Sequence, residues 1–155
     1  MQKPSVHWRS YLPRTSEGHW VESQKSTIPN AGKGLFATKK FKKNKRIGSY
    51  AGENISVAQN NQRYGGGARD NAPYALSARN VPGRILDSAC SRSLLSLANS
   101  KRRRKDNNAK FSSHMKGDGT INVISTKRIK EGDEIFIDYG KGYWKGAQWS
   151  LHATK

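Results

Sequence analysis

The sequence is poor in cysteine, acidic residues and long apolar runs. It has one cysteine, Cys90, among 155 residues, which excludes an internal disulfide framework and a zinc site built from several cysteines. A single cysteine is also typical of proteins from a reducing, intracellular compartment. No apolar run approaches the roughly 18 residues of a membrane-spanning helix, and the start MQKPSVHWRS has no apolar stretch typical of a secretory signal. We therefore expect an intracellular protein without a membrane segment or a metal site.

What the sequence has in excess is positive charge. The sequence has 29 lysines and arginines but only 11 acidic residues, so the formal charge at pH 7 is +18. Such an excess indicates an anionic partner such as nucleic acid, or a site of action near one. Four Trp, six Tyr and four Phe argue against a wholly disordered basic tail. With 34 % hydrophobic residues, we expect one domain with a modest core.

Short apolar stretches separated by turn signals predict a mainly β (α+β) domain with little helix. The stretches expected as strands are residues 35–37, 47–53, 74–78, 84–87, 110–111, 120–125 and 134–139. The turn between the third and fourth strands is expected at Pro82-Gly83. A helix or irregular insert is expected within residues 54–72, and a short helix at residues 92–98.

The expected domain covers residues 25–145. An irregular lead-in of residues 1–24 precedes it, because aromatic and polar residues are mixed there without a clear period. Residues 146–155 are expected to form a short tail.

Three segments carry residues that could line a binding site, although each also has a common structural explanation. Gly32 and Gly34, on either side of Lys33, would let the backbone approach a ligand closely, but glycines in this pattern also mark a plain hairpin turn. Asn99 could hold a ligand through its amide, but such residues more often cap helices or form turns. Tyr139, at the end of a predicted strand, could face a cleft or belong to the core.

Two runs of cations are the fourth feature. Residues 39–46 contain six lysines and arginines and no acid, and residues 101–105 read KRRRK. A solvated charged face is the simplest explanation, but adjacent cations repel one another and favour an anionic partner. The residues expected to contact nucleic acid are Lys101, Arg102, Arg103, Arg104 and Lys105.

The order and spacing of these segments are more specific than any one of them. The opening resembles that of a SET domain, with the family's G-x-G-x-F-A and I-x-x-Y-x-G-E in IPNAGKGLFATKKFKKNKRIGSYAGE. Asp87 resembles the aspartate of the family's I-D-A, and it stands twelve residues before Asn99, as in the family's R-F-x-N-H-S. Asn108-Ala109 resembles the P-N-A segment, and the closing I-x-x-G-E-E-[IL]-x-x-x-Y-G is similar to IKEGDEIFIDYGKGYW. The resemblance covers residues 26–144.

The resemblance implies an S-adenosylmethionine-dependent protein-lysine methyltransferase. The implied SET-domain fold consists of small curved antiparallel sheets with a C-terminal pseudoknot. The implied cofactor contacts are Gly32, Lys33, Gly34, Leu35, Tyr74, Asn99, Ser100 and Tyr139. Tyr139 would also be the catalytic tyrosine. The residues expected to line the substrate lysine channel are Tyr74, Tyr143 and Trp144.

The resemblance also suggests partners and a location. The expected substrate is a lysine of a histone or another basic protein, with the nucleus as the compartment. Nucleosomal DNA is a further expected partner through the basic loops, because phosphate contacts add affinity that does not depend on sequence. With one cysteine, the chain cannot carry the cysteine-rich zinc modules that flank many larger relatives. Recruitment of the substrate through a homodimer or a partner protein is therefore left open.

Two departures from the family pattern keep a second function open. Ser100 replaces the family's histidine after Asn99, and Ser96 replaces its arginine. The alternative function is a SET-like domain that has lost catalysis and binds chromatin or nucleic acid. A basic nucleic-acid-binding protein unrelated to methylation is the third hypothesis, and only the motif spacing argues against it.

Overall fold

The computed structural model describes residues 20–64, 75–89 and 93–140, mostly as short strands. The strands are β1 (Val21–Lys25), β2 (Lys33–Ala37), β3 (Arg46–Tyr50), β4 (Glu53–Ser56), β5 (Ala75–Ser77), β6 (Arg84–Asp87), β7 (Ala109–Met115), β8 (Ile121–Ser125), β9 (Glu134–Ile135) and β10 (Ile137–Asp138). The helical segments are α1 (Val57–Tyr64) and two short 3-10 helices, η3 (Leu94–Leu97) and η4 (Arg104–Asp106). The mainly β fold class predicted from the sequence is confirmed.

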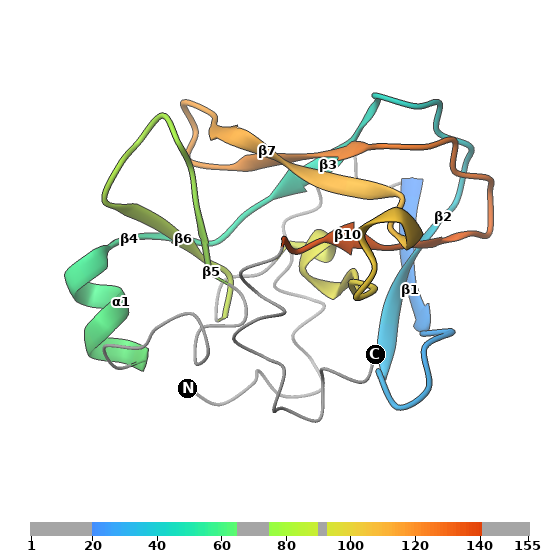
Figure 1. Cartoon of the computed structure of the whole chain (residues 1–155), viewed down its shortest axis with the longest axis horizontal. Coiled ribbons are helices and arrows are strands. Elements are labelled where there is room, and N and C mark those ends of the chain that lie inside the picture. Colours follow the sequence, from blue (N-terminus) through green and yellow to red (C-terminus); the bar gives the residue numbers. More distant parts are fainter. Residues whose placement is uncertain (1–19, 65–74, 90–92, 141–155) are drawn as a thin grey trace.

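The described strands form three small sheets (Figure 1). Their strand orders are β1-β2-β9, β10-β7-β8-β3 and β4-β6-β5. Neighbouring strands run antiparallel except β10 and β7, which are parallel. The pairings of β8 with β3 and with β7 each contain a register shift, and such irregularities bend a strand and increase its twist. The expected small, curved antiparallel sheets are therefore present.

The N-terminal boundary of the domain differs from the prediction. Residues 21–24, expected in the irregular lead-in, belong to β1, which pairs with β2 from Val21 opposite Ala37 to Lys25 opposite Lys33. The strand sequence VESQK has one apolar residue, so it carries no alternation that could reveal a strand. Burial of Val21 and pairing with β2 form the strand instead.

Two stretches predicted as continuous strands are interrupted. Residues 47–53 contain most of β3 and the first residue of β4, and residues 134–139 contain β9 and β10. Phe136 separates β9, which pairs with β2, from β10, which pairs with β7. The alternation of apolar residues reports which face of a strand is buried, but not which strand lies beside it. A change of partner therefore leaves no mark on the sequence pattern.

The remaining elements agree in type with the prediction. The hairpin of β5 and β6 turns where expected, and Gly83 has a φ of +79°, which favours glycine. The insert after β4 begins with the helix α1, and η3 lies within the predicted short helix. The longest helix, α1, has eight residues, so the described part of the chain contains no helix able to cross a membrane.

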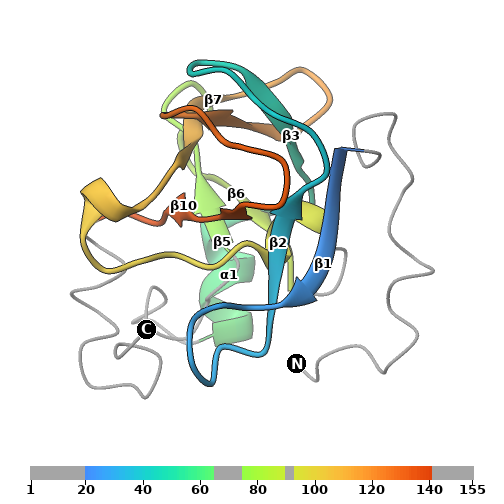
Figure 2. The same cartoon turned by 90° about the vertical axis from the view of Figure 1, so that its right-hand side faces the viewer.

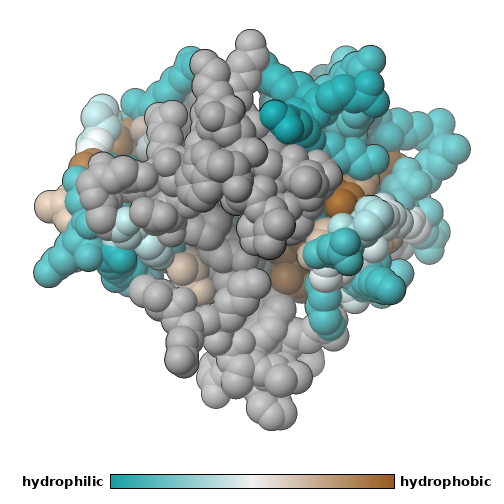
Figure 3. All heavy atoms as spheres, turned by 60° about the horizontal axis from the view of Figure 1, so that its bottom comes forward, coloured by the Kyte–Doolittle hydropathy of each residue, from teal (hydrophilic) through white to brown (hydrophobic). Residues whose placement is uncertain are grey.

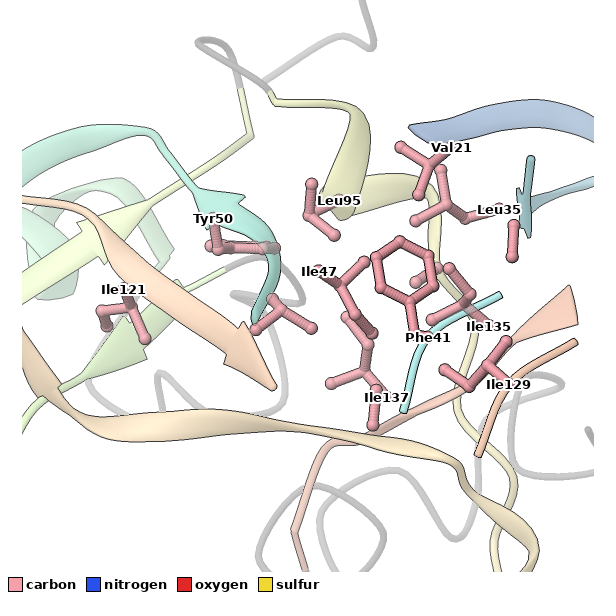
Figure 4. Close-up of a cluster of buried hydrophobic side chains, with 14 of the residues drawn as sticks. Val21, Leu35, Phe41, Ile47, Tyr50, Leu95, Ile121, Ile129, Ile135 and Ile137 are labelled. Atoms are coloured by element: carbon pink, nitrogen blue, oxygen red, sulfur yellow. The ribbon is translucent and has the colours of Figure 1, made fainter. Parts of the chain in front are cut away.

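One hydrophobic core joins the three sheets. Leu35 and Ile135 come from the first sheet, Ile137 from the second and Leu86 from the third, and all four are fully buried. Figure 4 shows Leu35, Ile135 and Ile137 around the ring of Phe41. Burying each side chain of this size contributes about 1.5–3 kcal/mol. Because Ile135 and Ile137 are alternate residues of one segment, their burial fixes the position of the chain just before Tyr139.

That closing segment passes between two distant parts of the chain. The amide of Ile137 donates a hydrogen bond to the Asn99 carbonyl at 2.9 Å. On the other side, the Phe136 carbonyl accepts hydrogen bonds from the amides of Asn108 and Ala109, both at 3.0 Å. Since the C=O and N–H of one peptide group point in opposite directions, the segment lies between residue 99 and residues 108–109. This threading is the pseudoknot expected from the sequence.

A buried carboxylate ties α1 to the sheet β4-β6-β5. Asp87 of β6 is 2 % exposed and accepts hydrogen bonds from Arg63 Nη1 at 3.1 Å and Tyr64 Oη at 2.7 Å. Arg63 also pairs with Glu53 of β4 at 2.8 Å. Burial of the phenol, together with the hydrogen bond to Asp87, raises the pKa of Tyr64 to about 12. The helix is therefore held to the sheet at its last turn.

Removing the phenol hydroxyl tests this attachment. We expect Tyr64→Phe to lower the free energy of unfolding by about 1.5 kcal/mol, because a buried carboxylate loses a charge-assisted donor. Urea unfolding of the variant and the parent measures the difference. No loss of stability would mean that Asp87 does not depend on this hydroxyl.

The same variant has an expected pH dependence. A phenol with an ordinary pKa near 10 in the unfolded chain and about 12 in the fold binds more protons when folded at pH values between the two. The contribution of Tyr64 is therefore fully present below pH ~10 and is lost as the pH rises toward ~12. The stability difference between the parent and Tyr64→Phe should shrink over that interval, as followed by urea unfolding at each pH. A constant difference would contradict the assignment.

Candidate active site

A buried carboxylate organises the turn that joins β1 to β2. Glu134, at the start of β9, is 6 % exposed. Its Oε1 accepts a hydrogen bond from Ser26 Oγ at 2.7 Å, and its Oε2 accepts bonds from the amide of Thr27 at 2.8 Å and from Thr27 Oγ1 at 2.5 Å. Buried carboxylates are tolerated when several donors replace water in this way. The network fixes the shape of the turn and its distance from β9.

Gly32 in this turn and Gly34 in β2 are needed for different structural reasons. Gly32 has a φ of +72°, a conformation that other residues rarely adopt. Gly34 is needed for space, because a Cβ at this position would lie 2.2 Å from Oε1 of Glu134. The turn therefore requires a glycine for its backbone conformation, and β2 requires one where it approaches Glu134.

Asn99 connects this turn to the closing segment. Its Nδ2 donates hydrogen bonds to the Lys33 carbonyl and to Ser26 Oγ, each at 3.1 Å. The backbone of Asn99 forms a parallel bridge with Phe136, as described for the pseudoknot. The structure thus brings the predicted residues Lys33 and Asn99, 66 positions apart, into direct contact.

Tyr139 meets the same segment from the other side. Its hydroxyl donates a hydrogen bond to the carbonyl of Ala98, and its amide donates one to Ser100 Oγ at 3.3 Å. Its ring stacks on Phe111 with centroids 6.3 Å apart, and Phe111 meets Tyr50 edge-on at 5.1 Å. Because Ala98, Asn99 and Ser100 are consecutive, one short segment holds both Tyr139 and the glycine turn.

The hydrogen bond that the Tyr139 hydroxyl donates determines how its oxygen can act on a further group. A tyrosine hydroxyl has one proton and two lone pairs. With its proton donated to Ala98, the Tyr139 oxygen can act only as an acceptor toward any further group. It is therefore suited to an electropositive group, such as the N–H of an amine.

Most of the predicted cofactor residues gather at this point of the fold. They are Gly32, Lys33, Gly34, Asn99, Ser100 and Tyr139. Leu35, whose implied contact is through its backbone, lies in the central strand of its sheet. Its side chain is fully buried in the core, and its backbone pairs with Ser23 of β1 and Ile135 of β9. Tyr74, Tyr143 and Trp144, expected at the lysine channel, lie outside the described residues.

Several residues of this site were missed by the sequence prediction. Ser26 and Glu134 meet across 108 positions, and no local pattern reveals a contact of that kind. Ala98 takes part through its carbonyl, which every residue type possesses. The available signal was the position of Glu134 within the closing motif, but an acidic residue beside a turn is usually solvent-exposed.

Comparison with known proteins gives a family match. The family model described as "SET domain" matches residues 32–140 of this chain. A curated relative, "Histone-lysine N-methyltransferase MEDEA" of Arabidopsis thaliana, is 31 % identical over 134 residues. That match covers 77 % of this chain and 16 % of the relative, so the chain spans about one sixth of its length.

Solved structures with the same fold come from larger assemblies. The "Crystal structure of the Chaetomium Thermophilum polycomb repressive complex 2 (PRC2)" contains a chain with 26 % identity and a TM-score of 0.63, matched over 78 % of this chain and 15 % of that one. A structure titled "ctPRC2 in an autoinhibited conformation bound to S-adenosylmethionine" has 25 % identity and a TM-score of 0.62, over 77 % and 15 % of the two chains.

Proposed function

Since this chain belongs to the family of SET-domain proteins, we propose that it transfers a methyl group from S-adenosylmethionine to the side-chain amine of a protein lysine. The observation that carries the proposal is the three-residue segment Ala98–Ser100. It holds the Tyr139 hydroxyl through Ala98 and the glycine turn through Asn99. One continuous segment thus connects a candidate cofactor site with a candidate catalytic oxygen.

The donors and acceptors near Asn99 fit the cofactor. Its amino-acid part carries both an ammonium and a carboxylate, and a side-chain amide offers both an acceptor and donors. Gly32 is exposed, and apart from its chain neighbours no atom of a described residue lies within 4 Å of the position where its Cβ would stand, so a ligand can approach the backbone there. We expect Lys33, Gly34, Asn99 and Ser100 to hold the cofactor. When bound, it supplies an activated methyl group.

The residues of this chain then have to prepare the lysine amine. A lysine with its ordinary pKa of ~10.4 is protonated at pH 7 and has no lone pair for attack. The stacked rings of Tyr139 and Phe111 provide an apolar wall, and an apolar environment lowers a lysine pKa. The Tyr139 oxygen accepts an N–H of the neutral amine and orients it. Orientation of this kind can supply a large part of the rate.

Histone tails are the proposed substrates, with the nucleus as the compartment. The support comes from the curated relative, whose name states histone-lysine methylation. Such tails are lysine-rich segments next to DNA. The chain carries +18 charges and would repel a basic tail alone, so a tail presented on DNA is the better substrate.

A second candidate function is a chromatin-binding domain without activity. Ser96 stands where the family pattern has an arginine, and its buried hydroxyl donates a hydrogen bond to the Ser93 carbonyl at 2.8 Å. The family's charged group is therefore replaced by a neutral, locally bonded one. Both functions predict cofactor binding at Asn99, and only the first predicts transfer.

Two measurements test the proposal. S-adenosylmethionine should raise the thermal unfolding temperature, because a ligand that binds only the folded state stabilises it. Methyl incorporation into free histones and into nucleosomes, located by mass spectrometry, should then show modified lysines. Binding without incorporation would support the second function. An absence of both would contradict the two together.

A further inference from the structure

The fold joins two cationic segments that are separate in the sequence. The turn between β2 and β3 contains Lys42 and Lys45, and Ser125 at the end of β8 holds both ends of this turn. Ser125 Oγ donates a hydrogen bond to the Lys42 carbonyl at 2.6 Å and accepts one from the Lys45 amide at 2.9 Å. The turn that follows Ser125 carries three further cations at residues 127–130. These two basic turns are therefore neighbours.

A third cationic segment lies beside them. The carbonyl of Asn108 accepts a hydrogen bond from the amide of Thr126 at 2.8 Å. Lys127 Nζ donates one to the Lys105 carbonyl, which places the KRRRK loop against the turn at residues 127–130. In Figure 1, the turn before β3, the turn before β9 and η4 all lie toward the right-hand end of the four-stranded sheet, the end that faces the viewer in Figure 2.

Some cations of these segments are engaged elsewhere. Lys39 Nζ lies 4.2 Å from the ring centroid of Trp20, and Lys101 Nζ lies 4.5 Å from that of Phe136. Both lysines are only partly exposed. The expectation that all of residues 101–105 contact nucleic acid therefore needs revision, since Lys101 covers an aromatic ring. Within residues 42–45, 102–105 and 127–130, the exposed cations are Lys42, Lys43, Lys45, Arg102, Arg103, Arg104, Lys105, Lys127, Arg128 and Lys130.

We propose that these ten exposed cations, here called the basic surface, bind the phosphate backbone of duplex DNA without sequence preference. Lysines and arginines on turns held by main-chain bonds suit a regular polyanion, because phosphate contacts position a duplex without reading bases. Arg103 and Arg104 are partly neutralised by Asp106 and Asp138, each at 2.8 Å. The other eight have no ion pair with a described residue, so the net positive charge is large.

An acidic protein is the less favoured occupant. Protein interfaces normally have an apolar or aromatic centre. The exposed large hydrophobic residues among those described are Trp20 and Val57, and neither lies on the basic surface. On the face shown in Figure 3, hydrophobic atoms of the described residues are scattered among hydrophilic ones. A surface of charge without an apolar centre fits phosphates better.

The basic surface also lies next to the candidate active site. Arg104 Nε bonds Asp138 Oδ2 at 2.8 Å, and Asp138 directly precedes Tyr139. DNA on this surface would bring attached protein tails toward Tyr139. This preference for DNA-bound substrates rests on the proposed function, whereas the DNA binding itself does not.

The test compares two matched triple variants. Lys127→Gln, Arg128→Gln and Lys130→Gln are combined in the first, because this turn joins the other two segments. Lys25→Gln, Arg79→Gln and Arg84→Gln are combined in the control, since these exposed cations lie outside the basic surface. Binding of a fluorescent DNA duplex of mixed sequence is measured by anisotropy from about 50 to 200 mM salt.

The parent should lose affinity steeply with salt, and a second duplex sequence should bind equally. Each lost phosphate contact should reduce the slope of log K against log salt by ~0.9, so the first variant should lose ~2–3 from the slope. The control should keep the parent slope. Equal slopes for all three proteins, or equal losses in both variants, would overturn the proposal. Binding to polyglutamate in preference to DNA would also overturn it and indicate an acidic protein partner.

Methyl-transfer assays separate the two proposals. We expect the first variant to modify a free histone peptide like the parent, and nucleosomes at least tenfold more slowly. Equal rates on nucleosomes, despite weaker DNA binding, would disprove the substrate preference. If no protein transfers methyl groups but the salt slopes behave as expected, the DNA-binding surface stands and the proposed activity fails.

Discussion

Tyr139→Phe is expected to reduce methyl transfer by about 10²–10³-fold while S-adenosylmethionine binds almost as tightly as in the parent. The substitution removes one oxygen, the one held by the Ala98 carbonyl, and leaves the ring. The phenyl ring can keep its stacking on Phe111. The lost function is then the orientation of the amine, which acts on kcat rather than on cofactor affinity.

Single-turnover transfer and calorimetric titration of the cofactor measure the two effects separately. Tyr50→Phe is the matched control, because Tyr50 belongs to the same group of rings and loses the same atom. Its transfer rate should stay within severalfold of the parent. If Tyr139→Phe were as active as Tyr50→Phe, Tyr139 would have no catalytic role. A lost cofactor affinity would instead mean that Tyr139 acts mainly in binding.

The order and spacing of the motifs along the chain predicted more of the fold than the residue pattern within any one segment did. The strand β8, the turn between β5 and β6, and the glycine turn have clear local signals, since apolar residues alternate in β8 and glycines mark the two turns. β1 has no such signal, because only Val21 of its five residues is both apolar and buried. The change of partner at Phe136 depends on strands far away in the sequence. The spacing between motifs can predict such long-range pairings only because it resembles the spacing in a known family.

The candidate site shows the same division. The sequence predicted Asn99 and Tyr139, but not that Ala98 holds the Tyr139 hydroxyl. It also did not predict Glu134, since burial of a carboxylate depends on donors supplied by the distant turn. The cationic runs are evident in the sequence. That Ser125 brings two basic turns together is seen only in the folded chain. Long-range contacts account for each of these omissions.

The tight approach of Gly34 to Glu134 gives the second large effect. In Gly34→Ala, the new Cβ would lie 2.2 Å from Oε1 and 2.9 Å from Cδ of Glu134. The carboxylate cannot move aside without breaking its bonds to Ser26 and Thr27. Overpacking alone costs about 1–3 kcal/mol, and a buried carboxylate that loses donors costs more. Because Asn99 bonds the same turn, cofactor affinity should also fall at least tenfold.

Urea unfolding and calorimetric titration of S-adenosylmethionine measure both losses. Gly117→Ala is the control, since its φ is not positive and no atom of a described residue beyond its chain neighbours lies within 4 Å of its Cβ position. It should change stability by less than ~0.5 kcal/mol. Adding Glu134→Ala to Gly34→Ala removes the atoms that clash. If the contact is the cause, the double variant should lose less stability than the sum of the single losses, because contacting residues are not additive. Additive losses would place the defect of Gly34→Ala elsewhere in the turn.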